Sequence, residues 1–135
     1  MRGSIAGWHL FVDAEVIHDN LELLNDCNHI NQFFIDLVDL LDMEILDGPR
    51  ITQVPYVEKN LENDHDDGGV SGVCLITTSH LSIHTWPLRR KFSLDAYSCK
   101  EFDCQKTLDF IKDRFGVDKI SYQWHTRSWP DVQEQ

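Results

Sequence analysis

Hydrophobic residues recur at helical spacing in two segments of the chain. The first segment places apolar side chains every three or four residues, at Ile30, Phe33, Phe34, Leu37, Val38, Leu40 and Leu41. Acidic residues occupy the positions between them, so the pattern predicts an amphipathic helix with one buried face and Asn28 as its N-cap. A second helix is expected to open at 101–103 and to end at Gly116. Its predicted buried side carries Leu108, Phe110, Ile111 and Phe115.

Short β-prone segments surround these helices and predict six strands. Their expected ranges are 8–13, 51–57, 70–76, 81–86, 91–97 and 119–124. Pro55 indicates an edge strand or a bulge, because proline cannot donate to a ladder. Asp47-Gly48-Pro49 is expected to act as a break, and 17–25 as a loop with a short helix.

The order of these elements predicts the fold class. Two helices and about six strands with short connections indicate an α+β protein. We expect a two-layer α/β sandwich, in which a mostly antiparallel sheet carries the two main helices on one face. At 135 residues, the whole chain 1–135 is expected to form a single domain.

Charge limits the classes of partner. The chain has 23 acidic and 12 basic residues and a formal net charge of -11. Nucleic-acid binding is not expected, because it requires a basic surface that faces the phosphates. The acidic balance mildly favours a cationic small molecule as ligand.

The cysteines and the N-terminus bear on location. The four cysteines include no CxxC pair, so neither a disulfide framework nor a cysteine metal site is expected. The first residues lack an apolar signal region, and no apolar run reaches the length of a membrane span. We therefore expect a cytoplasmic protein with free thiols, without a membrane partner.

Polar residues with reactive side chains interrupt the predicted strands between 68 and 99. Ser71, Ser79, His84 and Cys99 lie in or beside apolar β-structure, where an unsatisfied polar group costs free energy. A conventional serine nucleophile is one interpretation. The Gly-x-Ser-x-Gly pattern of hydrolases is absent, however, because Gly69-Val-Ser-Gly72 is one residue too short. His80-x-x-x-His84 has metal-ligand spacing only on a helix, and the flanking residues favour a strand, so no metal site is predicted.

Four motifs together resemble one family. They are Gly7-Trp-His-Leu10, Gly69-Val-Ser-Gly72, Thr78-Ser-His-Leu-Ser-Ile-His-Thr-Trp-Pro87 and Ser98-Cys99. This set resembles the S-adenosylmethionine decarboxylase proenzymes of bacteria and archaea over roughly residues 7 to 115, with the specific motifs between 69 and 104. The resemblance implies the α/β sandwich of that family, assembled as a homodimer of processed protomers.

The resemblance also implies self-cleavage between Thr78 and Ser79. The Ser79 hydroxyl attacks the Thr78 carbonyl and gives an ester. Ser71 is similar to the family serine that supports this processing step. His84 is similar to the family histidine that accepts the Ser79 α-proton, so that the ester eliminates.

Processing would divide the chain into a β chain, 1–78, and an α chain, 79–135. The new α chain would begin with a covalent pyruvoyl group derived from Ser79, the pyruvate cofactor of this family. Its carbonyl forms a Schiff base with the substrate amine and acts as an electron sink during loss of carbon dioxide. Cys99 is similar to the family proton donor. The implied role is decarboxylation of S-adenosylmethionine in polyamine (spermidine) biosynthesis.

Two positions depart from the family pattern. Thr78 stands where relatives usually carry an acid before the processed serine. Leu88 stands where relatives carry a glutamate that binds the ribose hydroxyls, and leucine cannot accept hydrogen bonds. The remaining substrate-binding residues are unknown from sequence, with Tyr56 the only guess for an aromatic that stacks on adenine.

Three hypotheses therefore stand side by side. The first is a pyruvoyl-dependent decarboxylase acting on S-adenosylmethionine. The second keeps that cofactor chemistry but acts on arginine or ornithine. It is motivated by Leu88, whose side chain cannot accept hydrogen bonds from the ribose hydroxyls of S-adenosylmethionine. The third is an unprocessed homologue that serves as a binding or regulatory subunit, motivated by Thr78 and Leu88 together.

Overall fold

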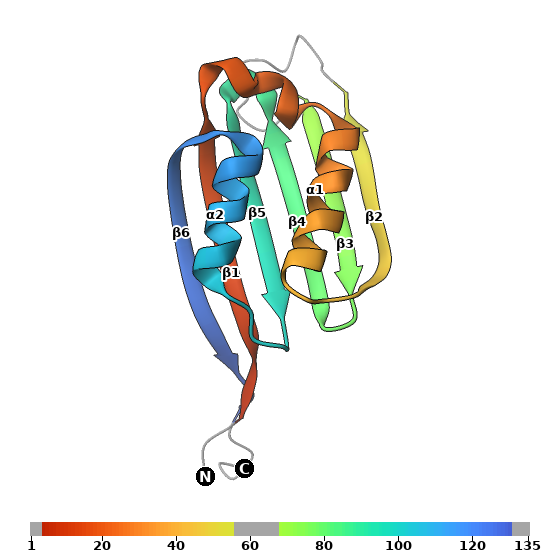
Figure 1. Ribbon diagram of the computed structural model, residues 1–135, viewed down its shortest axis with the longest axis vertical. Helices are drawn as coiled ribbons and strands as arrows, with labels where there is room; N and C mark the ends of the chain where they lie inside the picture. The colour runs from red at the N-terminus through yellow and green to blue at the C-terminus, as the bar shows by residue number, and fades with distance from the viewer. Residues whose placement is uncertain (1–3, 56–67, 131–135) are drawn as a thin grey trace.

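An antiparallel sheet covered on one face by two helices forms the body of the protein (Figure 1). The computed structural model describes residues 4–55 and 68–130. The strands are β1 (Ile5–Val16), β2 (Ile45–Val54), β3 (Gly69–Ile76), β4 (Ser79–Trp86), β5 (Lys91–Ser98) and β6 (Val117–Ser128). The strand order is β2-β3-β4-β5-β1-β6, and every neighbouring pair is antiparallel.

The helices confirm the predicted two-layer sandwich. Helices α1 (Cys27–Leu40) and α2 (Cys104–Phe115) lie side by side on the same face of the sheet, and the 3-10 helix η1 (His18–Leu24) crosses one end (Figure 1). A second short 3-10 helix, η3 (Pro87–Arg89), connects β4 to β5. The predicted α+β class is therefore correct.

The two faces of the sheet differ in chemistry. On β4, Leu81, Ile83 and Thr85 are buried beneath the helices, whereas the residues between them face the other way. The core between the layers includes four fully buried aromatic side chains, Phe33, Phe34, Phe92 and Phe115. We call the opposite side of the sheet, which carries Phe11, Ser71, His84, Ser93 and Asp95, the open face.

Side chains and a glycine define the helix ends. The Asp26 carboxylate accepts hydrogen bonds from the backbone N–H groups of Asn28 and His29 at 2.9 and 3.2 Å. Asp26 is therefore the N-cap of α1, and the prediction of Asn28 is wrong by two residues. A carboxylate is favoured there because it also faces the positive end of the helix dipole. Gly116 ends α2 with a φ of 63°, as predicted.

Strand β2 differs most from the prediction. It begins at Ile45 and runs through Asp47-Gly48-Pro49, so the expected break there is wrong. The pairing with β3 shifts register on both sides of Asp47, and this bulge accommodates a proline that has no N–H to donate. The edge position indicated by Pro55 is correct, since β2 is the outermost strand. The end of the predicted 51–57 segment lies outside the described residues.

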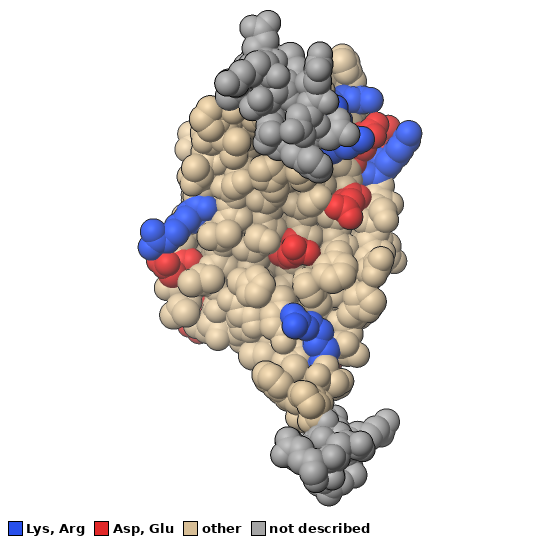
Figure 2. Space-filling view, turned by 180° about the vertical axis from the view of Figure 1, so that it is seen from behind, with Lys and Arg blue, Asp and Glu red and all other residues tan. Residues whose placement is uncertain are grey.

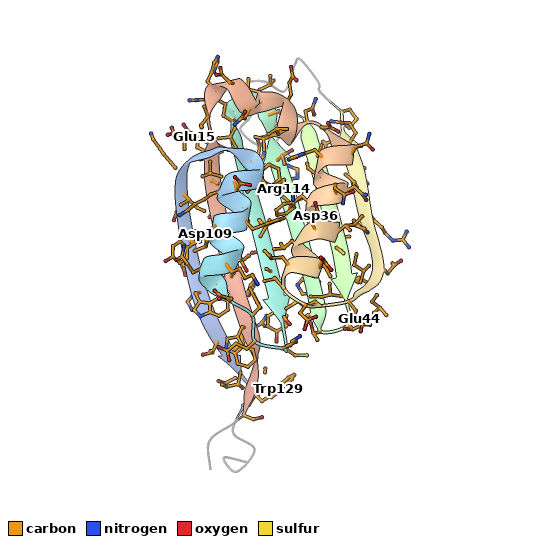
Figure 3. The ribbon with its side chains drawn as sticks, viewed as in Figure 1. Glu15, Asp36, Glu44, Asp109, Arg114 and Trp129 are labelled. Carbon is orange, nitrogen blue, oxygen red and sulfur yellow. The ribbon has the colours of Figure 1, made fainter. Side chains whose placement is uncertain are left out.

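An ion pair joins the two helices above the sheet. Arg114 Nη1 donates to Asp36 Oδ2 at 2.8 Å, so that α2 is tied to α1 (Figure 3). Hydrogen bonds from Gln32 and Arg114 lower the pKa of the Asp36 carboxyl. The Arg114 guanidinium lies 4.5 Å from the centre of the Phe110 ring. Phe110, predicted to be buried, is accordingly half-buried and supports the arginine.

Candidate active site

The turn between β3 and β4 contains the predicted cleavage position. Ser79 begins β4 and lies opposite Ser98 on β5. The backbone N–H of Cys99 donates to the carbonyl oxygen of Thr78 at 2.9 Å. A donor aimed at this oxygen polarises the carbonyl and stabilises negative charge that develops on it. We call Thr78, Ser79 and Cys99 the cleavage half-site.

Exposure distinguishes Cys99 from the other cysteines near the core. All four cysteines of the chain are free thiols, and Cys99 is exposed. Burial raises the pKa of the Cys74 and Cys104 thiols, which suits packing rather than chemistry. Cys99 is therefore the cysteine that a ligand at the cleavage half-site can reach.

Ser71 and His84 form a second cluster on the open face. They are directly opposite each other on β3 and β4, and Ser71 Oγ lies 2.6 Å from His84 Nδ1. The His84 ring also packs edge-on against Trp86, with centroids 4.3 Å apart. A cavity of about 420 Å³ adjoins the pair, lined among others by Ser82, Ser93 and Asp95. We call Ser71 and His84 the serine–histidine half-site.

The two half-sites are separated within one copy of the chain. His84 follows Ser79 by five residues on the same strand, and a strand rises about 3.3 Å per residue, which gives about 16 Å. One copy therefore brings Ser71 to His84 and Cys99 to Thr78, but it does not bring His84 to Ser79.

The glycine before Ser71 is required by close packing. Gly69 has a φ of 136°, and a Cβ at this position would collide with the carbonyl oxygen of Thr85. Only glycine avoids both the backbone strain and this contact. Gly69 thus allows β3 to approach β4 closely, two residues before Ser71 pairs with His84.

The two positions considered for substrate binding, Leu88 and Tyr56, supply no hydrogen-bonding side-chain group among the described residues. Leu88 lies in η3 and is 58% exposed. Two residues further on, Arg90 Nη2 lies 3.3 Å from Glu15 Oε1 on β1. Position 88 therefore offers no acceptor for a ribose diol. Tyr56 lies outside the described residues.

Two contacts near the site were not expected from sequence. The Ser98 hydroxyl donates to Thr78 Oγ1 at 2.8 Å. On the open face, His9 Nε2 lies 3.6 Å from Asp95 Oδ1, and burial lowers the pKa of His9. The only sequence signal for the first contact was a hydroxyl residue directly before Cys99. No sequence pattern pointed to the contact between His9 and Asp95, and we assign Asp95 no catalytic role.

The described residues contain neither a metal-binding cluster nor a membrane-spanning helix. In residues 4–55 and 68–130, no three His, Cys, Asp or Glu side chains are grouped to hold a metal ion. No helix in this part of the chain has the length and apolar character needed to cross a bilayer.

The sandwich and its polar hairpin define a small α+β protein with a candidate cleavage site, and comparison with known proteins shows the family. Residues 8–128 match the family model described as S-adenosylmethionine decarboxylase. The chain therefore belongs to the S-adenosylmethionine decarboxylase family. The prediction of a decarboxylase-type carboxy-lyase is confirmed at this level.

Individual relatives agree with this assignment. The chain is 32% identical over 110 residues to the S-adenosylmethionine decarboxylase proenzyme of Pyrococcus furiosus, covering 81% of this chain and 69% of that protein. It is 32% identical over 106 residues to the proenzyme of the same name from Geobacillus sp. (strain WCH70), covering 78% and 76%. The crystal structure of the adenosylmethionine decarboxylase from Aquifex aeolicus matches with a TM-score of 0.70 at 20% identity, over 96% of each chain. This likeness shows that the fold is shared.

Proposed function

We propose that this chain is a self-processing enzyme that forms a pyruvoyl group from Ser79 and decarboxylates S-adenosylmethionine in polyamine (spermidine) biosynthesis. The observation that carries the proposal is the hydrogen bond from the Cys99 N–H to the Thr78 carbonyl, beside a serine hydroxyl at position 79. The relatives in the family are named proenzymes, which supports a precursor that matures by cleavage.

Cleavage begins with an acyl shift within the hairpin. Ser79 Oγ bonds to the Thr78 carbonyl carbon, the bond from that carbon to the Ser79 nitrogen breaks, and the hydroxyl proton passes to the nitrogen. The Cys99 N–H stabilises the negative charge on the Thr78 oxygen during this step. The product is an ester that joins Thr78 to the Ser79 side chain.

Elimination then releases the β chain. A base removes the Ser79 α-proton, a Cα–Cβ double bond forms, and the Cβ–Oγ bond breaks to free residues 1–78 as a carboxylate. The resulting enamine tautomerises and takes up water, ammonia leaves, and a ketone remains at position 79. His84 is the proposed base, with its ring oriented by Ser71 at 2.6 Å.

Because the half-sites are about 16 Å apart in one copy, we propose that two copies combine them. In this homodimer the Ser71 and His84 of one copy serve the Ser79 of the other. The open face is the proposed contact surface: most of it consists of residues other than Lys, Arg, Asp and Glu, although the net charge of the chain is -11 (Figure 2). A weakly charged sheet face suits contact with an identical face.

Cys99 is the proposed proton donor in decarboxylation. A pyruvoyl carbonyl at position 79 would supply the electrophile for the substrate amine and the electron sink for loss of carbon dioxide. The residues present fit such a group, since position 79 adjoins an exposed thiol and a backbone donor. Cys99 then delivers its proton to the substrate carbon from which carbon dioxide has departed.

Two measurements test this proposal. Intact mass of the purified protein should show two fragments divided between Thr78 and Ser79, with a blocked N-terminus on the second. Labelled carbon dioxide should then be released from carboxyl-labelled S-adenosylmethionine. A chain that stays whole under all conditions contradicts the proposal and favours the third hypothesis, a binding or regulatory subunit.

A second candidate substrate class is arginine or ornithine. The exposed Leu88 favours it, because this position lacks the acceptor that a ribose diol would need. A panel of the three substrates with the processed enzyme distinguishes the candidates. We further propose a cytoplasmic location, where the four free thiols would remain reduced.

A further inference from the structure

We propose that Ser98 is a positioning residue for self-cleavage, which fixes the orientation of the Thr78 carbonyl before Ser79 attacks it. This inference rests on the proposed self-processing and names a residue to which the preceding steps give no role.

The Ser98 hydroxyl connects two strands at the cleavage position. Ser98 is 1% exposed, and its hydroxyl donates to Thr78 Oγ1 at 2.8 Å while accepting from the Lys100 N–H at 3.0 Å. Both hydrogen-bonding functions of this buried hydroxyl are thus used. Such a group has a defined orientation, because any rotation leaves a partner unsatisfied.

Thr78 is held at two points by consecutive residues. Ser98 holds its side-chain oxygen, and the Cys99 N–H holds its carbonyl oxygen at 2.9 Å. With both oxygens fixed, rotation about the Cα–C bond of Thr78 is restricted. The Thr78 carbonyl carbon therefore keeps one position relative to the Ser79 hydroxyl, and such preorganisation favours the five-membered ring of the acyl shift.

The turn that carries these groups is itself anchored. Lys100 Nζ donates to the backbone carbonyl of Asp42 at 2.8 Å, just after the C-terminus of α1. The Ser98 hydroxyl, which accepts from the Lys100 N–H, is thereby connected to the helical layer. Thr78 is consequently positioned by the sandwich and not by its own hairpin alone.

The test is a double-mutant cycle on the rate of self-cleavage, measured by intact mass on the freshly purified full chain. Ser98→Ala and Thr78→Val should each slow cleavage about five- to tenfold, since each removes one buried hydrogen bond. The double variant should cleave no more slowly than either single variant, because both changes remove the same contact. Ser98→Thr keeps the hydroxyl and should restore the rate to within about twofold.

A matched control separates positioning from general stability. Thr107 is also fully buried, and its hydroxyl donates to the Asp103 carbonyl at 2.8 Å in α2. Thr107→Val should lower the unfolding temperature but leave the cleavage rate unchanged. Hydroxylamine, which cleaves esters, should not accelerate Ser98→Ala, because in this variant ester formation is the slow step.

Four results would overturn the inference: wild-type rates in Ser98→Ala, additive effects in the double variant, equal slowing by Thr107→Val, or rescue of Ser98→Ala by hydroxylamine. If Ser98→Ala does not fold, Thr78→Val and Ser98→Thr still decide the question. A wild-type chain that never cleaves defeats the proposed function itself, and the inference with it. Cleavage of the wild type together with unaffected variants defeats only the inference.

Discussion

Two variants that are each unable to cleave should recover cleavage when they are mixed in one dimer. A general base must approach the proton that it removes to about 3 Å. Along β4, His84 is about 16 Å from Ser79. A histidine side chain spans only a few ångströms, so rotation of the ring cannot cover the difference. If His84 is the base, as proposed, it acts on the Ser79 of a second copy.

The experiment combines Ser79→Ala with His84→Ala by co-expression, with a different affinity tag on each chain. In a mixed dimer, the His84→Ala chain contributes an intact Ser79, and its partner contributes an intact His84. With equal expression and random pairing, about half of the His84→Ala chains lie in mixed dimers and should cleave. Because the Ser79→Ala chain has no serine to process, every fragment found by mass spectrometry must derive from the other chain.

Either variant alone should stay whole, and this gives the baseline. His80→Ala is the matched control: His80 precedes His84 on the same face, and this variant should cleave without help. The reasoning is refuted if mixed dimers copurify through both tags but contain no fragments. It is equally refuted if His84→Ala alone cleaves at the wild-type rate.

Three further predictions concern the scaffold. Gly69→Ala should lower the free energy of unfolding by at least about 2 kcal/mol in urea titration, because its Cβ would collide with the Thr85 carbonyl oxygen. Asp36→Ala should cost only about 1 kcal/mol by the same measurement, because its ion pair with Arg114 is partly exposed. Burial lowers the pKa of His29 below its ordinary value of 6.5, so the unfolded chain binds the proton more readily. Stability should therefore fall as pH drops below 6.5, and His29→Gln should reduce this loss between pH 7 and 5.5.

Each of these predictions can fail in a distinct way. A Gly69→Ala protein with wild-type stability would mean that β3 moves away from β4 at no cost. A loss of several kcal/mol in Asp36→Ala would mean that the pair with Arg114 is more shielded from water than its exposure indicates. Identical pH profiles for wild type and His29→Gln would assign the acid sensitivity to other groups, among them His9.

The sequence predicted the two layers well because hydrophobic periodicity is local. Leu81 and Ile83 alternate with polar residues, and this alternation alone separates the buried face of β4 from the open face. The element boundaries were harder to predict, because they depend on tertiary pairing. Asp47-Gly48-Pro49 reads as a break in sequence, yet β3 pairs on both sides of it and extends the strand.

The candidate site shows the same division between residue type and geometry. Motif resemblance indicates Ser71, Ser79, His84 and Cys99 as candidates, but spacing along the chain does not reveal which of them meet. Five residues separate Ser79 from His84, a short interval in sequence that becomes a long one on an extended strand. Ser71 is thirteen residues from His84 and yet touches it, because the β3–β4 hairpin folds back. Because of this geometry, the proposed chemistry needs a second copy of the chain. Within one copy, Thr78 is held by hydrogen bonds from the residues at the end of β5, Ser98 and Cys99.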